Sequence, residues 1–167
     1  MKPTNEMVSQ WINEYIDTYG GEVLKRAWDK RYVYGHAPFN NAEDCYHVWL
    51  DLIDKVKEAL RTLPTFELIY EAVKAMKIKG IGPLTIYDTA TMLAFPDKKY
   101  PAAVYLHAGA KKGAEAIGIT GGMAEKSQFV ALYPSFEQLS PAEIEKFLCV
   151  YRDKLMGEPG NKSRRGC

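Results

Sequence analysis

The chain has 167 residues, of which 47% are hydrophobic and 26% charged, and its formal net charge is +1. This composition is typical of a folded globular protein and excludes an intrinsically disordered chain, a fibrous repeat and a small disulfide-rich scaffold. No run of about 18 apolar residues is present, and we expect no signal peptide, because the first residues lack its basic and apolar regions. The sequence therefore predicts one cytoplasmic domain without a membrane segment or a cofactor.

Hydrophobic residues recur at helical spacing along most of the chain. The spacing predicts helices over about 8–19 and 22–34, then a loop over 35–41 in which Asn40 or Asn41 caps a third helix. That third helix carries one apolar stripe, which we expect to face the core. The stripe consists of Cys45, Val48, Trp49, Leu52, Ile53, Val56 and Leu60.

Cap residues mark the later helices. Thr65 is predicted to open a fourth helix, and Pro83 suits the first turn of a fifth helix that runs to about Ala94. The run 140–143, Ser-Pro-Ala-Glu, is a capping box with proline at the first helical position. The segment 129–133 fits either a short helix or an extended piece.

A further helix is predicted over 102–117, where Gly109 and Gly113 lie four residues apart. Glycines at this spacing leave one helix face without side chains, so we expect another backbone to approach closely there. No alternating strand pattern or internal repeat is present in the sequence. The fold class predicted is all-α, a single compact bundle of seven or eight helices over 1–156, followed by a disordered basic tail over 157–167.

The cysteines and histidines show no spacing typical of metal ligands. Cys45, Cys149 and Cys167 are an odd number of widely separated residues, and His36 and His47 have no further ligand nearby in the sequence. Cys45 and Cys149 lie on or beside apolar stripes and are predicted to be buried small hydrophobic residues. We therefore expect no metal site.

Positive charge is concentrated in two regions. Between residues 74 and 112, seven lysines against Asp88 and Asp97 leave a local balance of +5, and residues 151–167 carry five cationic side chains against two acidic ones, or +3. Basic regions on a nearly neutral chain can attract a polyanion. Scattered lysines in contact with solvent are the alternative interpretation.

The segment 76–94 contains the turn Gly80-Ile81-Gly82 between two predicted helices. Two glycines permit a tight turn, and a helix that starts there presents unpaired amides to an anion such as a phosphate. Ile81 would anchor the turn in the core, while Lys77 and Lys79 could reach neighbouring phosphates. A simple helix–helix corner is the alternative interpretation.

This segment resembles the helix-hairpin-helix motif of DNA-binding proteins, here over about 66–94. The resemblance rests on Gly80-Ile81-Gly82 together with Thr85 and Ala90 at positions where the family has small residues. It implies contacts to the DNA backbone that do not depend on base sequence. It also suggests a small bacterial or phage protein. The predicted phosphate-binding residues are Lys77, Lys79, Gly80, Ile81, Gly82, Leu84, Thr85, Lys111 and Lys112.

The chain is also distantly similar to the helix-hairpin-helix DNA glycosylases. In the bifunctional members a catalytic lysine occupies the position of Leu84, and most members have a catalytic aspartate near the position of the segment 102–105, which has no carboxylate here. Without that aspartate, the developing positive charge on the sugar has no stabilising carboxylate. The resemblance therefore implies DNA binding without the usual glycosylase residues.

His107 precedes Lys111 and Lys112 in a second basic stretch. If a helix begins at Ala108 or Gly109, these side chains could hold a second phosphate, or His107 could act as a general acid or base with Asp88. A capping or packing role for His107 is the alternative.

Three functions follow from these patterns. The leading hypothesis is DNA binding through the turn. The alternatives are a divergent DNA-processing enzyme that uses His107 and Asp88, and an interaction module that binds another protein.

Overall fold

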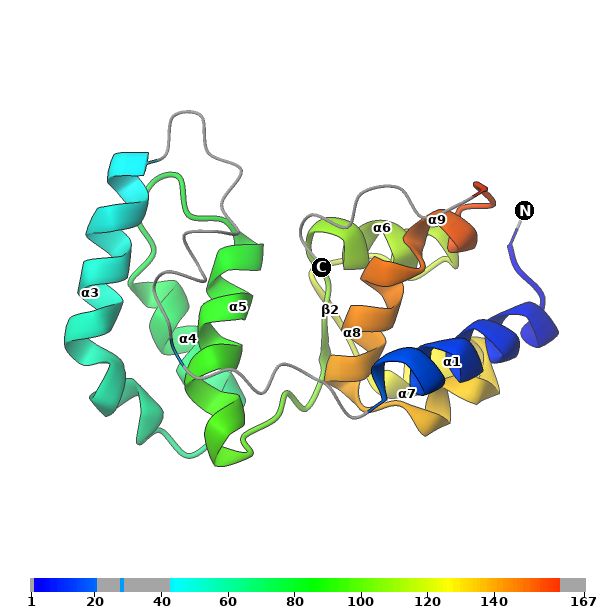
Figure 1. Ribbon diagram of the computed structural model, residues 1–167, viewed down its shortest axis with the longest axis horizontal. Helices are drawn as coiled ribbons and strands as arrows, with labels where there is room; N and C mark the ends of the chain where they lie inside the picture. Colours follow the sequence, from blue (N-terminus) through cyan, green and yellow to red (C-terminus); the bar gives the residue numbers. More distant parts are fainter. Residues whose placement is uncertain (1, 21–27, 29–42, 160–167) are drawn as a thin grey trace. The chain divides into compact units, whose positions relative to one another are not determined.

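The computed structural model describes residues 2–20, 28 and 43–159 (Figure 1). The described chain is mostly helical, which confirms the predicted all-α class. The α-helices are α1 (Asn5–Tyr19), α3 (Glu43–Arg61), α4 (Phe66–Ala75), α5 (Pro83–Ala94), α6 (Ala108–Ala116), α7 (Lys126–Leu132), α8 (Pro141–Val150) and α9 (Arg152–Leu155). Two short 3-10 helices, η1 (Phe95–Asp97) and η2 (Pro134–Gln138), and two strands, β1 (Val104–Tyr105) and β2 (Met123–Ala124), complete the described elements.

The chain divides into two compact units. Unit 1 combines Met1–Val23 with Ala102–Cys167, and unit 2 consists of Leu24–Pro101. The sequence predicted a single domain over 1–156, and its helical pattern gives no sign of this division. Each unit is described by itself below.

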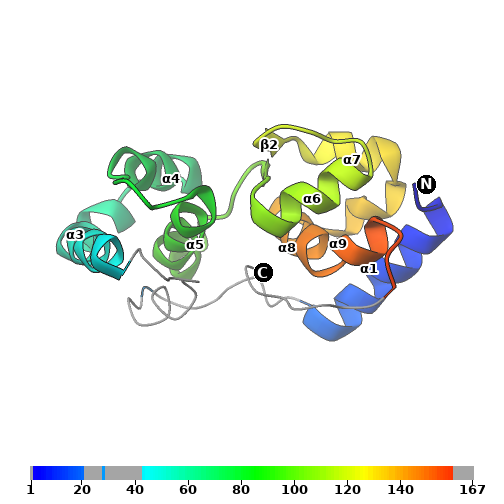
Figure 2. The ribbon, with the colours of Figure 1, turned by 90° about the horizontal axis from the view of Figure 1, so that it is seen from above.

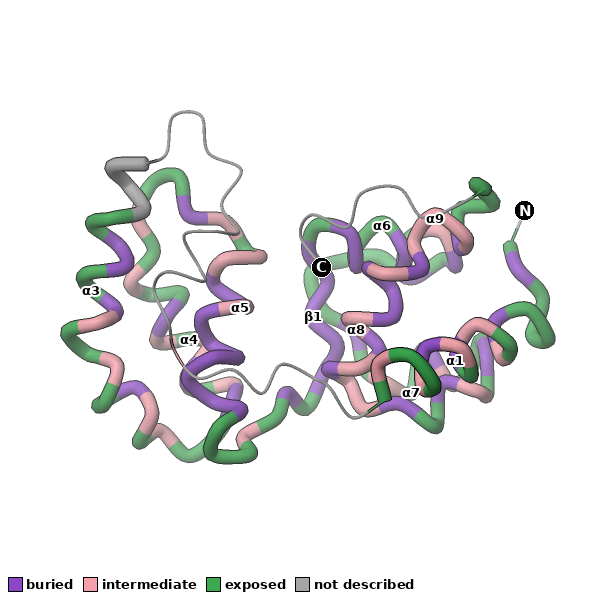
Figure 3. Tube along the Cα trace, viewed as in Figure 1, coloured by how far each residue is buried: buried purple, intermediate pink, exposed green. Residues whose placement is uncertain are grey.

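Unit 2 contains α3, α4 and α5, and α4 packs against both of the other helices (Figures 1 and 2). From Ile86 onward α5 is buried at nearly every position (Figure 3). A helix that is buried on most of its sides must be covered by neighbouring elements, and both α3 and α4 pack against α5.

The predicted apolar stripe of α3 is buried along one line only. Trp49, Ile53 and Leu60 are buried, whereas Val48, Leu52 and Val56 are exposed, with 56%, 37% and 36% of their surface accessible. Successive helix residues are about 100° apart, so the line through residue 52 lies about a quarter-turn from the line through residue 53. The expectation that the whole stripe faces the core is therefore wrong for Val48, Leu52 and Val56. The side chain of Cys45 lies outside the described residues.

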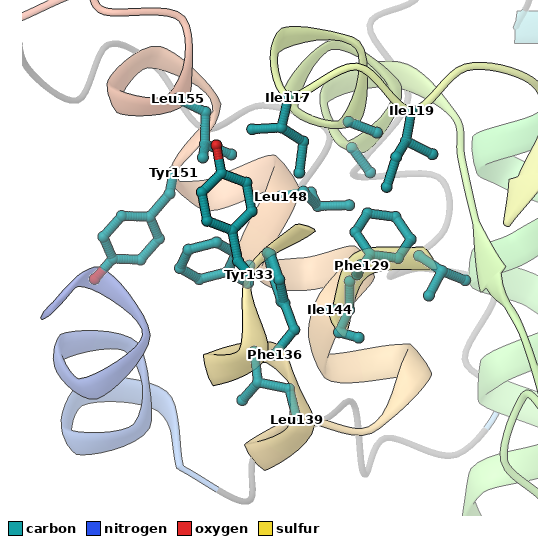
Figure 4. Packing of buried hydrophobic residues seen from close by; sticks show 14 of the residues in the cluster. Ile117, Ile119, Phe129, Tyr133, Phe136, Leu139, Ile144, Leu148, Tyr151 and Leu155 are labelled. Carbon is teal, nitrogen blue, oxygen red and sulfur yellow. The ribbon is translucent and has the colours of Figure 1, made fainter. Parts of the chain in front are cut away.

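The core of unit 1 is rich in aromatic rings (Figure 4). Phe136 of η2 meets Phe129 of α7 and Phe147 of α8 edge to face, each at 5.5 Å between ring centres. Tyr15 of α1 also meets Phe147 edge to face, at 5.9 Å between ring centres. These rings join helices from both ends of the chain, and edge-to-face pairs add to the stabilisation from their burial.

The predicted close approach at Gly109 and Gly113 is confirmed. A Cβ on Gly113 would collide with the backbone carbonyl of Leu148, and one on Gly109 would lie 2.6 Å from Sγ of Cys149. Both neighbours belong to α8, so the missing side chains of α6 allow the two helices to pack with their backbones in contact.

The helix predicted over 102–117 is shorter than expected. Residues 104–105 form β1, which pairs antiparallel with β2 in the register Val104 to Ala124. The amide of Leu106 continues this contact by donating to the carbonyl of Gly122 at 2.9 Å. The prediction of a helix is therefore wrong for 102–107, since a partner from elsewhere in the chain satisfies the backbone groups of 104–106.

The predicted helix starts are confirmed where they are described. The hydroxyl of Thr65 accepts from the amide of Leu68, and Pro83 is the first residue of α5. Ser140 and Glu143 form the predicted capping box. The segment 129–133 is helical through Leu132. Apart from Trp28, the predicted helix over 22–34 lies outside the described residues, as do the loop over 35–41 and most of the predicted tail.

Cys149 is buried, with 3% of its surface accessible, as predicted. It takes part in a disulfide bond rather than remaining a thiol, and its partner lies outside the residues whose side chains are described. Disulfides are typical of oxidising compartments, so cytoplasmic location stays a prediction.

Candidate nucleic-acid interface

The predicted turn connects α4 to α5 within unit 2. The amide of Lys77 donates to the carbonyl of Lys74 at 3.1 Å as α4 ends. Gly80 then has a φ of +95°, a left-handed conformation that an L side chain rarely adopts. This residue reverses the chain, and α5 begins three positions later.

Ile81 anchors the turn in the unit. Only 2% of its surface is accessible, although both neighbouring glycines are at least partly exposed. Its amide donates to the carbonyl of Ile78 at 3.2 Å, which closes the turn on itself. Ile81 is therefore buried as predicted, and both its burial and its backbone hydrogen bond stabilise the turn.

The first turn of α5 has no side-chain cap. Gly82 is the N-cap residue, with φ −100° and ψ 175°, and it has no side chain that could accept from the helix amides. Its carbonyl accepts from the amide of Ile86 at 3.2 Å, as in the first regular helical bond. A helix start of this kind carries partial positive charge from its N-terminal amides.

The charge around the turn has one sign. Between Glu71 and Asp88 the sequence carries three lysines, Lys74, Lys77 and Lys79, and no carboxylate. All three lysines are exposed, and the first turn of α5 contains no acidic residue. The helix dipole and the lysines therefore favour the same kind of ligand, an anion.

The other predicted phosphate-binding residues fall into two places. Leu84 and Thr85 lie half-buried in the first turn of α5, beside Gly82. Lys111 and Lys112 are exposed on α6, in unit 1. The structure thus gathers the predicted residues of 77–85 at one turn of unit 2 and places the lysine pair in the other unit.

His107 is the N-cap residue of α6 and is almost fully buried. Its Nε2 lies 3.3 Å from Oε1 of Glu145 on α8, where 5% of the histidine side chain and 13% of the glutamate side chain are accessible. The contact is an ion pair only when the histidine is protonated. Glu145 is absent from the residues singled out in the sequence.

Ala108 follows with a φ of +44°, an uncommon conformation for a residue with a Cβ. The start of α6 is therefore set by a buried histidine contact and by a left-handed residue. The His107 side chain makes no capping hydrogen bond to the helix, so its burial agrees with the packing alternative and not with capping by the side chain.

Asp88, the predicted partner of His107 in chemistry, lies half-buried on α5 in unit 2. Its backbone carbonyl accepts from the hydroxyl of Thr91 at 2.8 Å. The two residues predicted to act together belong to separate units, and Glu145 is an acidic neighbour of His107 within unit 1.

Within the described part of the chain, no three His, Cys, Asp or Glu side chains gather where they could hold a metal ion. Among the described helices, none is both long and apolar enough to cross a membrane. No known protein family, curated protein or solved structure matches this chain.

Proposed function

We propose that the chain binds DNA through the phosphate backbone, with the turn between α4 and α5 as the contact. The observation that carries the proposal is a helix start without a side-chain cap that is flanked by exposed lysines, in a segment, residues 72–87, whose sequence contains no carboxylate. Phosphate oxygens are good acceptors for backbone amides at a helix N-terminus.

The side chains at the turn favour a contact that ignores base sequence. Of the side chains that commonly pair with base edges, residues 77–85 include only Lys77, Lys79 and Thr85, and no Arg, Asn, Gln, Asp or Glu. The lysines act on phosphates as point charges and carry little information about the bases. Binding is therefore expected to depend on salt far more than on sequence.

The first experiment measures fluorescence anisotropy of labelled duplex and single-stranded DNA across a salt series. The Lys77→Gln/Lys79→Gln variant is expected to bind more weakly, and its slope of log K against log salt should fall by about 2, roughly 1 for each lost phosphate contact. The matched control is Lys2→Gln/Lys55→Gln, which removes the same charge from two exposed lysines that are not part of the turn. Equal losses in both variants would assign the binding to net charge rather than to the turn.

Gly82 offers a test that separates binding from folding. An added Cβ at this position meets no atom within 4 Å, and its φ of −100° suits any residue. Gly82→Asp is expected to cap the amides of α5, to stabilise the helix by a few tenths of a kcal/mol, and to weaken DNA binding, because a carboxylate then occupies the phosphate position. Thermal unfolding and anisotropy are measured on the same sample.

Gly82→Asn is the companion variant, since it caps the same amides without a charge. We expect its DNA affinity to lie between those of wild type and Gly82→Asp. Gly80 is a poorer probe, because its φ of +95° makes any substitution strain the turn. Unchanged binding by Gly82→Asp would exclude the turn as the site, and absence of wild-type binding at about 50 mM salt would leave protein interaction as the function to test.

A further inference from the structure

We draw no further inference here: the strongest candidate, the exposed apolar stripe of Val48, Leu52 and Val56 along α3, carries nothing because no described feature of the structure shows what covers it.

Discussion

The backbone of Ala108, the first residue of α6, is strained. Its φ of +44° costs a residue with a Cβ about 1–2 kcal/mol, and its side chain is exposed. Glycine adopts this conformation freely but loses roughly 0.5–1 kcal/mol more backbone entropy on folding. Ala108→Gly is therefore expected to stabilise unit 1 by about 0.5 kcal/mol, which corresponds to a rise of about 2–4 °C in Tm.

Differential scanning calorimetry checks this expectation. The control is Ala131→Gly, at an exposed position in the last turn of α7, where the same change should destabilise the unit by up to about 1 kcal/mol. A loss of stability in both variants would mean that the backbone at residue 108 is not strained.

At the residue scale, the sequence predicted those parts of the candidate site that are formed by adjacent residues. Gly80, Ile81 and Gly82 are adjacent, and their roles follow from backbone freedom and hydrophobicity alone. The contact between His107 and Glu145 joins separate helices of unit 1. No local pattern marks it, because Glu145 lies among the polar positions of an amphipathic helix and its partner is chosen by the packing of α6 on α8.

At the scale of elements, the packing of α6 on α8 depends on two glycines of α6, and Gly113 leaves less room for a side chain than Gly109 does. A Cβ at Gly113 would meet the carbonyl oxygen of Leu148, which is backbone and cannot turn aside. Gly113→Ala should therefore force the two helices apart and destabilise unit 1 by about 1–3 kcal/mol, the usual cost of overpacking. Urea unfolding followed by circular dichroism measures the change.

Gly122→Ala is the matched control for this measurement. Its added Cβ meets nothing within 4 Å, so the same chemical change should leave stability within about 0.5 kcal/mol of wild type. An equal loss in both variants would show that the cost comes from the glycine substitution itself and not from the contact with α8.

Elements whose ends are set by neighbouring residues were the ones that sequence predicted well. Thr65, Pro83 and Ser140 begin helices through bonds or dihedral angles within one turn. The pairing of β1 with β2 and the exposure of Val48 depend on which segment lies opposite. Tertiary packing decides which segments lie opposite one another. The sequence does not show this, because the hydrophobic period of a helix is the same whether or not a partner covers its face.

At the scale of the whole molecule, buried tyrosines make unit 1 sensitive to alkaline conditions. Burial and the nearby carboxylates of Glu143 and Glu145 raise the pKa of Tyr15 well above its ordinary value, and burial also raises the pKa of Tyr133. The folded unit therefore keeps these hydroxyls protonated at a pH where the unfolded chain ionises them. Their contribution to stability is complete below about pH 10 and is lost as the pH rises above it.

Urea unfolding between pH 8 and pH 11 tests this dependence. Tyr15→Phe is expected to flatten the fall in unfolding free energy above pH 10, by up to about 1.4 kcal/mol per pH unit, the limit for one titrating group. Tyr100→Phe, at a ring of unit 2 with 55% of its surface exposed, is the control for the removal of one tyrosine hydroxyl. The same slope for wild type and Tyr15→Phe would contradict the expectation.

Unit 1 is assembled from the two ends of the described chain. The hydroxyl of Tyr133 donates to the carbonyl of Pro3 across 130 positions, and Nζ of Lys154 lies 3.4 Å from Oε2 of Glu14 across 140 positions. During synthesis α1 therefore leaves the ribosome long before α8 and α9 exist to cover it, whereas every residue of unit 2 follows in one continuous stretch. The apolar face of α1 therefore stays exposed to water until translation reaches α8 and α9. Correct folding of unit 1 requires that α1 does not associate with other apolar surfaces during this time.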